Sequence, residues 1–473
     1  MQQNSQFQPH QTPDFVDVPI DDGSNPQWET RLGYPKLFNM FIGEENKAYC
    51  SPGLLTINQD YEFKDVRALI KTTFDKGAYI LVTDDNILKV KLDGDTTIIH
   101  RIRNTRLPVQ MSENLQNQIG IVDGLNFYVI DQRSGNFVTV MGEDEGFTFK
   151  SPISITVLNS FAVVLDLNTG GWAISEPNQM KVFPPLDNVS QISSSLTQAS
   201  TLETLDDNLF IFGTTGIERW VPSSTNNQYL FPFSKDNNFR VDFGSISVNG
   251  AERGFGKIYF LSSKFIPMMI TGRGTESQDI GAPGMARVIA SYPDADEAQG
   301  SFYTYEDNFF FCLYFPVSKI SWIYCENSGK WSNGDDNITC AVPRTNVVAN
   351  PEGLFELVHP EVSQTSKLRE WQSRRMKTYK GTQSYRELLN SIEAQLIQGF
   401  IQSSEDEPQE LRLKISLDSQ SWENSVTAYI GETGDRNDLT IWRCNIAAKE
   451  YTLNIQYQGT YNFTIDRVAV ILK

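Results

Sequence analysis

Residues Asp307–Trp331 read DNFFFCLYF-PVSK-ISWIYCENSGKW, and this stretch decides the fold that the sequence predicts. Phe309–Phe315 is an apolar, aromatic run of strand length, and a short break separates it from a second apolar run, Ile320–Tyr324. The pair Ser328-Gly329 follows, and a Gly after a small polar residue suits the positive φ of a hairpin turn or bulge. The stretch therefore predicts a β-hairpin with a further strand after it.

The same pattern occurs three times in the chain. In each copy a strand-like run is followed by three polar or neutral residues, a Ser-Gly or Thr-Gly pair, one more residue, and then Phe137, Trp172 or Trp331. Strand-like runs with a polar or Gly lead-in also recur, and neighbouring starts are roughly 35 to 50 residues apart, which is the period of propeller blades. The repeat predicts an all-β fold with a β-propeller of irregular blades. A β-sandwich with long loops is the structural alternative.

The composition is that of a globular protein. The chain has 473 residues, enough for two or three domains, with 12% aromatic and 21% charged residues. Its formal net charge of -18 argues against a general affinity for nucleic acid or for acidic membranes. An acidic wall would still let DNA slide past, whereas a basic wall would hold it.

Cysteine usage and hydropathy bear on the compartment. The five Cys are odd in number and form no Cys-x-x-Cys pair, which indicates free thiols packed as small hydrophobes in a reducing compartment. The N-terminus is polar and Gln-rich, and no apolar run approaches the length that spans a membrane. We therefore expect no membrane insertion, and no secretion other than release by cell lysis.

Three segments follow from the pattern along the chain. Residues 1–53 are interpreted as a tail and arm that end at the turn Pro52-Gly53. Residues 54–342 are almost entirely strand-like and form the predicted propeller. Residues 343–473 are predicted to form a C-terminal antiparallel β-sandwich, because apolar and polar residues alternate clearly from Leu411 onward.

Two stretches within these segments are ambiguous. Val189–Thr204 is rich in Ser, Thr and Gln, and we interpret it as an insertion loop. The apolar spacing in Arg386–Gly399 fits a helix slightly better than a strand, although both patterns are present.

The residues of familiar catalytic and metal sites do not converge in the sequence. The three His lie far apart, and no nucleophile elbow or phosphate-binding loop is present. Adjacent Asp pairs, such as Asp84-Asp85 and Asp206-Asp207, are interpreted as turn-forming residues. We expect no catalytic residue, no metal site and no cofactor; a carboxylate pair that cleaves glycans is a minor alternative.

One segment is strongly basic and holds a single acid, Glu370. Its basic residues are candidate contacts for DNA phosphates or for an acidic partner. They are Lys367, Arg369, Arg374, Arg375, Lys377 and Lys380. A solvated face that balances an acidic chain is the simpler interpretation.

Several short stretches match a known family through their order and spacing. They are FVDVPI from Phe15, LFIFGTTGIE from Leu209, DFGSI from Asp242, GKIYFLSS from Gly256, IASY from Ile289, the central hairpin, and RVAVI from Arg467. Through them the chain resembles, from Phe15 to Leu472, the packaged-DNA stabilisation protein of short-tailed lambdoid phages, also called the tail hub or nozzle. The Gln-rich N-terminus and the basic segment depart from that pattern. The resemblance makes Arg386–Gly399 a strand.

The resemblance implies a structural virion protein and not an enzyme. It implies a homo-oligomer, a hexameric ring, that completes the head below the portal and its adaptor ring, extends the DNA channel and helps to retain packaged DNA. It also implies sites for the tail needle and for tailspikes or fibres, with double-stranded DNA passing without sequence-specific binding. Such a protein is assembled in the host cytoplasm and resides in the virion tail. The alternative function is a β-propeller tail protein that binds a glycan or receptor, which predicts aromatic and acidic side chains on one face.

Overall fold

The structure is a computed structural model in which residues 14–20, 36–57, 61–102, 107–140, 149–166, 171–183, 189–191, 196, 199–223, 232–271, 277–282, 284–363, 365–378, 386–398, 409–418, 422–431 and 439–472 are described. Nearly all of its regular structure is strand, as the sequence predicts. It divides into two compact units. The first unit contains Leu54–Gly329 and Gly334–Val358, and the second contains Met1–Gly53, Lys330–Asn333 and His359–Lys473.

The first unit consists of successive small sheets, and the first three follow one another directly in the chain. The first sheet has the strands β6 (Ala68–Lys71), β7 (Ala78–Val82), β8 (Asn86–Lys91) and β9 (Thr96–Arg101). The second has β10 (Gln110–Glu113), β11 (Gln118–Val122), β12 (Phe127–Asp131) and β13 (Asn136–Thr139). The third has β14 (Pro152–Leu158), β15 (Phe161–Asp166), β16 (Gly171–Ile174) and β17 (Val189–Gln191).

Four further sheets complete this unit. The fourth has β18 (Ala199–Leu205), β19 (Asn208–Gly213), β20 (Ile217–Pro222) and β21 (Phe233–Lys235). The fifth has β22 (Ala251–Gly254), β23 (Lys257–Leu261), β24 (Pro267–Thr271) and β25 (Ser277–Asp279). The sixth, after the short helix α1 (Met285–Ile289), has β26 (Gln299–Tyr305), β27 (Asn308–Phe315) and β28 (Ile320–Cys325). The seventh has β30 (Cys340–Ala341), β31 (Val347–Asn350), β32 (Gly353–Val358) and β5 (Gly53–Thr56).

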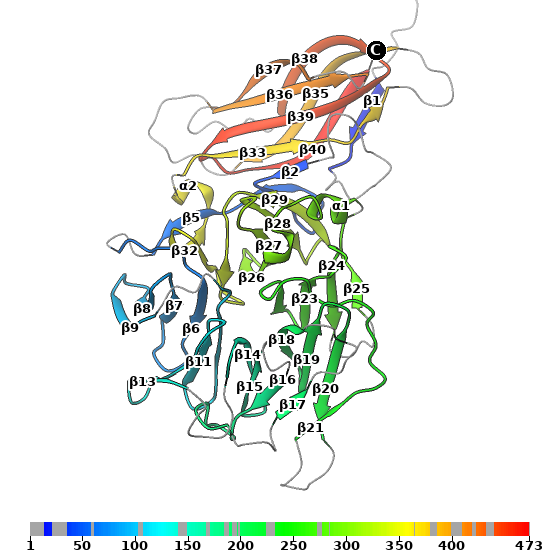
Figure 1. Cartoon of the computed structure of the whole chain (residues 1–473). Coiled ribbons are helices and arrows are strands. Elements are labelled where there is room, and N and C mark those ends of the chain that lie inside the picture. Colours follow the sequence, from blue (N-terminus) through cyan, green and yellow to red (C-terminus); the bar gives the residue numbers. More distant parts are fainter. Residues whose placement is uncertain are drawn as a thin grey trace, which may run out of the picture. The chain divides into compact units, whose positions relative to one another are not determined.

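The first strands of the seven sheets are the inner strands of the unit. They contact one another in chain order, from β6 through β10, β14, β18, β22 and β26 to β30, and β30 also contacts β6. Figure 1 shows the sheets following one another in this circular order. β5 precedes β6 in the chain yet pairs with β32 of the last sheet, so the two ends of the unit are joined by a strand pair. This is the strand order of a β-propeller, which the repeat predicts.

The central hairpin forms as predicted. β27 and β28 pair from Phe315 opposite Ile320 to Phe310 opposite Cys325. The side chains from Phe310 to Phe315 are all buried, because each face of this strand packs against a neighbouring sheet or strand. Gly329 has φ +69°, and Gly135, in an earlier copy of the pattern, has φ +71°. Both glycines therefore adopt the left-handed turn conformation that their spacing predicts.

Three stretches that carry the sequence resemblance meet at one junction, between the fourth and fifth sheets. The Gly213 N–H donates to the Gly216 carbonyl at 2.9 Å, and the Ser263 N–H donates to the Gly244 carbonyl at 2.8 Å. A Cβ on Gly244 would lie only 1.6 Å from the Gly213 carbonyl oxygen, and Ser245 forms a β-bridge with Ser262. Only glycine lets the two backbones approach this closely, so these stretches are structural junctions.

The second unit contains two layers that share one core, and their strands pair antiparallel except for the parallel pair β2–β29. One layer has β3 (Met40–Ile42), β4 (Ala48–Cys50), β40 (Phe463–Leu472), β35 (Glu387–Gln398) and β38 (Leu439–Ala448), with β1 (Asp14–Val18) also on β40. The other contains β29 (Lys330–Gly334), β2 (Lys36–Phe38), β33 (Lys367–Gln372), β39 (Glu450–Gly459), β36 (Gln409–Leu417) and β37 (Trp422–Gly431), with β34 (Met376–Lys377) on β39. The helix α2 (Pro360–Ser363) precedes β33. Side chains of both layers form one buried cluster, including Trp371 and Trp442, so the region is a β-sandwich.

Two local predictions from pattern alone are corrected. The slight helix preference of residues 386–399 is wrong, because β35 pairs with β40 on one side and with β38 on the other. The strand implied by the resemblance is confirmed over Glu387–Gln398. The insertion loop expected at residues 189–204 is also wrong where the structure describes it, since residues from Ala199 form the inner strand β18.

The division of the chain differs from the three segments suggested by the sequence. β1 and β4 pair with β40, and β2 pairs with β33, so residues before Gly53 belong to the same compact unit as the C-terminal strands. The propeller unit also continues past residue 342, because β31 and β32 complete its last sheet. Within the described residues no helix is long and apolar enough to cross a membrane.

Candidate functional site: the cavity and turn face of the first unit

A cavity of about 790 Å³ lies among the inner strands of the first unit. Every one of the seven inner strands contributes to its wall. Representative lining residues are Ile70, Met111, Thr156, Glu203, Glu252, Gly300 and Cys340. Its volume lies in the range of small-molecule sites. A DNA duplex, whose major groove alone is about 12 Å wide, could not pass through it.

Gln110 joins several of the strands around this cavity. Its Oε1 accepts hydrogen bonds from the Ser154 hydroxyl at 2.5 Å and from the Ile155 N–H at 3.3 Å. Its Nε2 donates to Thr201 Oγ1 at 3.1 Å and to the Val248 carbonyl at 3.2 Å. One amide thus links β10, β14, β18 and the segment before β22, which makes this part of the wall a fixed hydrogen-bonded network.

Two carboxyl groups face the cavity from neighbouring inner strands, Glu203 from β18 and Glu252 from β22. Burial raises the pKa of Glu203 to about 7, although the charge of Arg253 opposes this shift. Burial, and then the charge of Glu203, raise the pKa of Glu252 well above its usual range. The pair therefore retains at least one proton near neutrality, and the two groups titrate together.

This pair was not found in the sequence, because its members are roughly one propeller repeat apart and neither has an acidic neighbour. The only available signal was their position in the inner strands of consecutive repeats. The pair could hold a cationic group or transfer a proton. Within the residues that the structure describes, no group of three or more His, Cys, Asp or Glu side chains could hold a metal ion.

The turns that join each inner strand to the next strand form what we call the turn face. It comprises residues 72–77, 114–117, 159–160, 206–207, 255–256, 306–307 and 342–346. Four of these turns border the same cavity, through Leu115, Asp206, Phe255 and Arg344. Side-chain contacts join other turns to this group. Thr73 bonds Glu113 beside the second turn, and the ring of Phe255 lies 4.3 Å from that of Phe309 beside the sixth.

Large apolar side chains are exposed on the turn face. Leu115 is 82% exposed, and Phe74 and Phe255 are each 50% exposed. Phe255 also has φ +48°, at a turn position where Gly, Asn or Asp is usual. A bulky residue in the left-handed region is an outlier that costs free energy. Its ring lies against that of Phe309, so half of this strained, bulky side chain is buried and half remains accessible.

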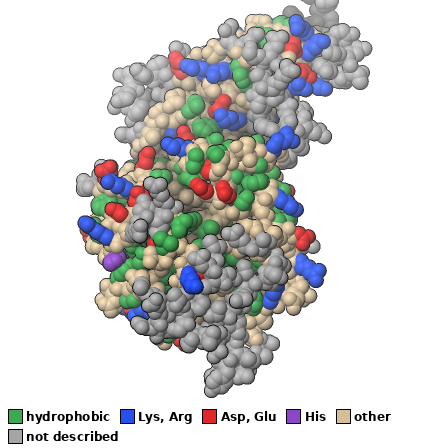
Figure 2. All heavy atoms as spheres, viewed as in Figure 1, with side chains coloured by type: hydrophobic (Ala, Val, Ile, Leu, Met, Phe, Trp, Pro, Cys, Tyr) green, Lys and Arg blue, Asp and Glu red, His purple; other side chains and the backbone are tan. Residues whose placement is uncertain are grey.

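Acidic residues also occupy the turn face. Asp206-Asp207 and Glu306-Asp307 are exposed turn residues that follow two of the inner strands. In total the seven turns contain five acidic and two basic side chains. Figure 2 shows that, on the side of the first unit that it presents, the described Lys and Arg side chains lie singly and form no basic patch. The turn face thus joins exposed apolar groups to a negative potential.

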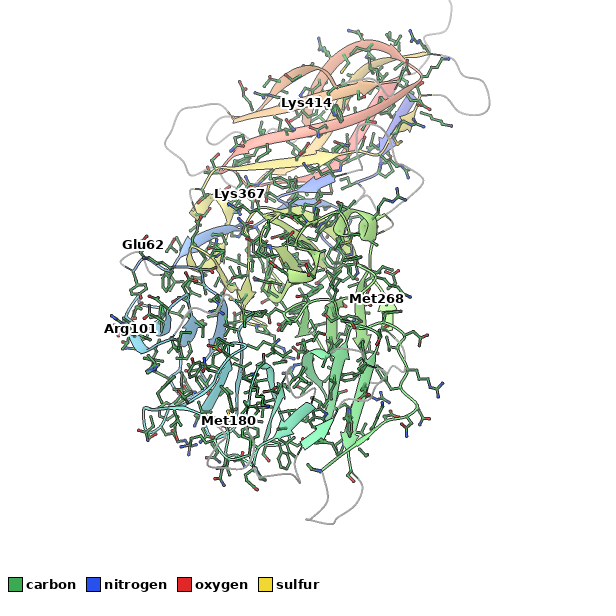
Figure 3. The ribbon with its side chains drawn as sticks, in the orientation of Figure 1. Glu62, Arg101, Met180, Met268, Lys367 and Lys414 are labelled. Carbon is green, nitrogen blue, oxygen red and sulfur yellow. The ribbon has the colours of Figure 1, made fainter. Side chains whose placement is uncertain are left out.

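The basic segment lies in the second unit and does not form one surface. Lys367, labelled in Figure 3, is buried, and its Nζ donates to the Pro52 carbonyl at 2.9 Å. Arg369 is only 1% exposed and donates to the Gly459 carbonyl at 2.7 Å. The expected basic surface is therefore corrected for these two residues, because β33 is a central strand whose side chains pack inside the unit.

The remaining basic residues of that segment are divided. Arg374 and Arg375 are half-buried, and Arg375 lies 3.3 Å from the carboxylate of Glu450. Lys377 is exposed, and Lys380 lies outside the described residues. The prediction that these four contact DNA or a partner stays a prediction.

Comparison with known proteins identified neither a family model nor a curated relative that matches the sequence. Solved structures with similar folds include an inactive virginiamycin B lyase from Staphylococcus aureus with quinupristin (12% identity, 64% of this chain, 98% of that chain, TM-score 0.46). PorZ of Porphyromonas gingivalis has 11% identity and a TM-score of 0.39 over 64% of this chain and 37% of PorZ, so the similarity spans about a third of PorZ. The extracellular domain of a one component system from B. thetaiotaomicron has 11% identity and a TM-score of 0.43, over 88% of this chain and 62% of that chain. The fold assignment rests on the strand order and not on these likenesses.

Proposed function

We propose that the chain is a structural virion protein, the tail hub of a short-tailed phage, which assembles into a ring below the portal and its adaptor. The observation that carries this proposal is that exposed apolar side chains lie on several separate surfaces of the chain. On the first unit they occupy the turn face and also turns at the opposite ends of the strands. On the second unit Leu439 and Ile441 lie exposed on one face of β38, and Ile397 is exposed on its partner β35. A subunit with several neighbours needs such surfaces.

The charge and the cavity support the same role. An acidic chain repels DNA, so a ring of such subunits would guide a duplex without holding it. The cavity within one propeller is too small for that duplex. In the proposed ring, DNA therefore passes along the axis between the subunits. The proposed role is structural, and retention of DNA follows from assembly and plugging of the ring.

The test uses DNA-filled heads that carry portal and adaptor but lack this protein. The purified full chain is added, the vertex is examined by negative-stain electron microscopy, and DNA leakage is measured in parallel. We expect a ring at the portal vertex and leakage that falls as the ring binds. Absence of a ring together with unchanged leakage would contradict the proposal.

A second candidate function is binding of a glycan or receptor by the propeller. The turn face favours it, because the half-exposed aromatic ring of Phe255 and the carboxyl group of Asp206 border the same cavity, which is of suitable size. A glycan array probed with the wild-type chain tests it. Specific hits that are lost in Phe255→Ala would favour this function over the hub.

A further inference from the structure

We propose that the turn face binds a basic, amphipathic segment of a partner protein. Apolar side chains of this segment would pack on Leu115 and Phe255, while its Lys or Arg side chains would face Asp206 and Asp207 at the cavity mouth. The inference deepens the proposed function, on which it rests for the existence of a partner. It names the chemistry of that partner, and its test is independent of ring assembly.

Two exposed apolar side chains border one cavity and can anchor a partner. Leu115, on the turn after β10, and Phe255, on the turn after β22, both line the cavity mouth. Leu115 is the most exposed large apolar side chain of the described residues, at 82%. Phe255 is held against Phe309, with 4.3 Å between the ring centroids, so it is already oriented before a partner arrives. Two apolar anchors at the rim of a concavity are the usual centre of a protein interface.

The charged side chains at the cavity determine which kind of partner is complementary to it. Asp206 lines the same cavity, and Asp207 follows it in the turn. Inside the cavity Glu203 and Glu252 add negative charge when they ionise. Three basic groups oppose them, Arg67, Arg253 and Arg344. Arg253 is engaged with the carbonyl and hydroxyl of Thr204, each at 3.3 Å.

The balance of charge on the exposed turns remains acidic, with five acidic against two basic side chains. One of the five, Asp75, is already paired with Lys89 at 2.6 Å, which leaves the acidic excess on the turns at residues 206–207 and 306–307, the first of which borders the same cavity as Leu115 and Phe255. A second copy of this chain carries a net charge of -18 and is a poor match for such a surface. A basic segment is complementary, and each Lys or Arg side chain that it directs at the cavity mouth favours ionisation of the carboxyl pair.

The experiment measures binding of a fluorescein-labelled synthetic peptide of Lys and Leu, patterned as an amphipathic helix, to the full chain by fluorescence anisotropy. An otherwise identical Glu/Leu peptide tests the charge, and a Lys/Ser peptide tests the apolar contact. We expect only the Lys/Leu peptide to bind with saturation. The double variant Leu115→Ser/Phe255→Ser should weaken binding by roughly tenfold or more, since it removes both anchors. Asp206→Asn/Asp207→Asn should weaken binding and reduce its dependence on salt.

The matched control is Leu125→Ser/Val317→Ser. These residues are 49% and 66% exposed, and they lie on turns at the opposite ends of their strands, after β11 and β27. We expect this variant to bind the Lys/Leu peptide as the wild type does. Circular dichroism melting curves establish that each variant is folded.

Three results would overturn the inference. The Lys/Leu peptide fails to bind the wild-type chain, the Lys/Ser peptide binds equally well, or the control variant loses as much affinity as Leu115→Ser/Phe255→Ser. A chain that forms rings at the portal vertex yet gives any of these results refutes this inference alone. A chain that binds the Lys/Leu peptide as expected but forms no ring refutes the hub proposal and retains the turn face as a binding surface.

Discussion

Gly244→Ala tests the junction where three stretches of the sequence resemblance meet. A Cβ at this position would lie 1.6 Å from the Gly213 carbonyl oxygen and 2.5 Å from that of Gly216. Both neighbours are backbone atoms, so a side-chain rotation cannot relieve the clash. The segment would have to move by about 1.5–2 Å to restore ordinary van der Waals contact.

That movement breaks hydrogen bonds at the junction. The Ser263 N–H donates to the Gly244 carbonyl at 2.8 Å, and the Ser200 hydroxyl donates to the Ser245 carbonyl at 3.2 Å. Losing two such bonds, with buried groups left unpaired, costs roughly 3–5 kcal/mol. Unfolding entropy is about 2.1 cal/mol/K per residue, or about 0.6 kcal/mol/K for a unit of about 300 residues. We therefore expect the first unit to melt roughly 5–8 °C lower.

The measurement is differential scanning calorimetry of wild type, Gly244→Ala and the control Gly353→Ala. A Cβ on Gly353 would make only ordinary contacts, at 3.5 Å from the rings of Phe355 and Phe63, so the control should lose about 1 kcal/mol or less. A melting temperature of Gly244→Ala within 1 °C of the control, an approximate limit set by the entropy above, would refute the close-approach argument.

Three further perturbations test other parts of the structure. Because the pKa values of Glu203 and Glu252 are raised, the folded state binds more protons than the unfolded state. The contribution of this pair to the free energy of unfolding is therefore complete below about pH 4.5 and is lost as pH rises through about 7. Between pH 5 and 8 the melting temperature should thus fall more for wild type than for Glu203→Gln/Glu252→Gln, and identical pH profiles would contradict the assignment. Asp294 accepts hydrogen bonds from the N–H groups of Val317 and Ser318 at 2.7 and 3.0 Å, so Asp294→Ala should destabilise the first unit by about 2–4 kcal/mol in chemical denaturation. Asp294→Asn should destabilise it by less, because the amide oxygen can still accept these bonds; equal losses for the two variants would contradict this and show that the charge itself is required. All five thiols are free, and three of them are buried, so a thiol reagent without reductant should label five thiols in denaturant but at most two in the native chain. The native reaction should be slow, because burial raises the pKa of the Cys444 thiol to about 11. Fast labelling of more than two thiols in the native chain would contradict the packing.

Local chemistry explains why much of the fold could be predicted. Apolar runs bounded by Ser-Gly or Asp-Asn turns fold into hairpins through contacts between near neighbours, as β27 and β28 do. The alternation after Leu411 likewise reports which side chains face a core. At β35 the spacing of apolar residues fits both a helix and a strand, so the sequence pattern does not decide between them. Pairing with β40 and β38 decides the conformation.

The site residues depended on contacts between distant parts of the chain. Glu203 and Glu252 face one cavity only because β18 and β22 are neighbouring inner strands. Lys367 and Arg369 resemble surface residues in the sequence, yet β33 lies between β2 and β39 and buries them. No local pattern contains this information, since burial of a charged side chain is set by what packs over it.

By itself the sequence determined the all-β class, the repeat of short antiparallel hairpins, the glycine-containing turns and the C-terminal sandwich strands, because these depend on side-chain alternation and on the φ angles that neighbouring residues allow. Only the tertiary structure decided that residues before Gly53 join the C-terminal sandwich, that seven inner strands enclose a cavity, and that Leu115, Asp206 and Phe255 border its mouth. These features arise from strand pairing and sheet packing between residues far apart in the chain, whose geometry local preferences do not specify.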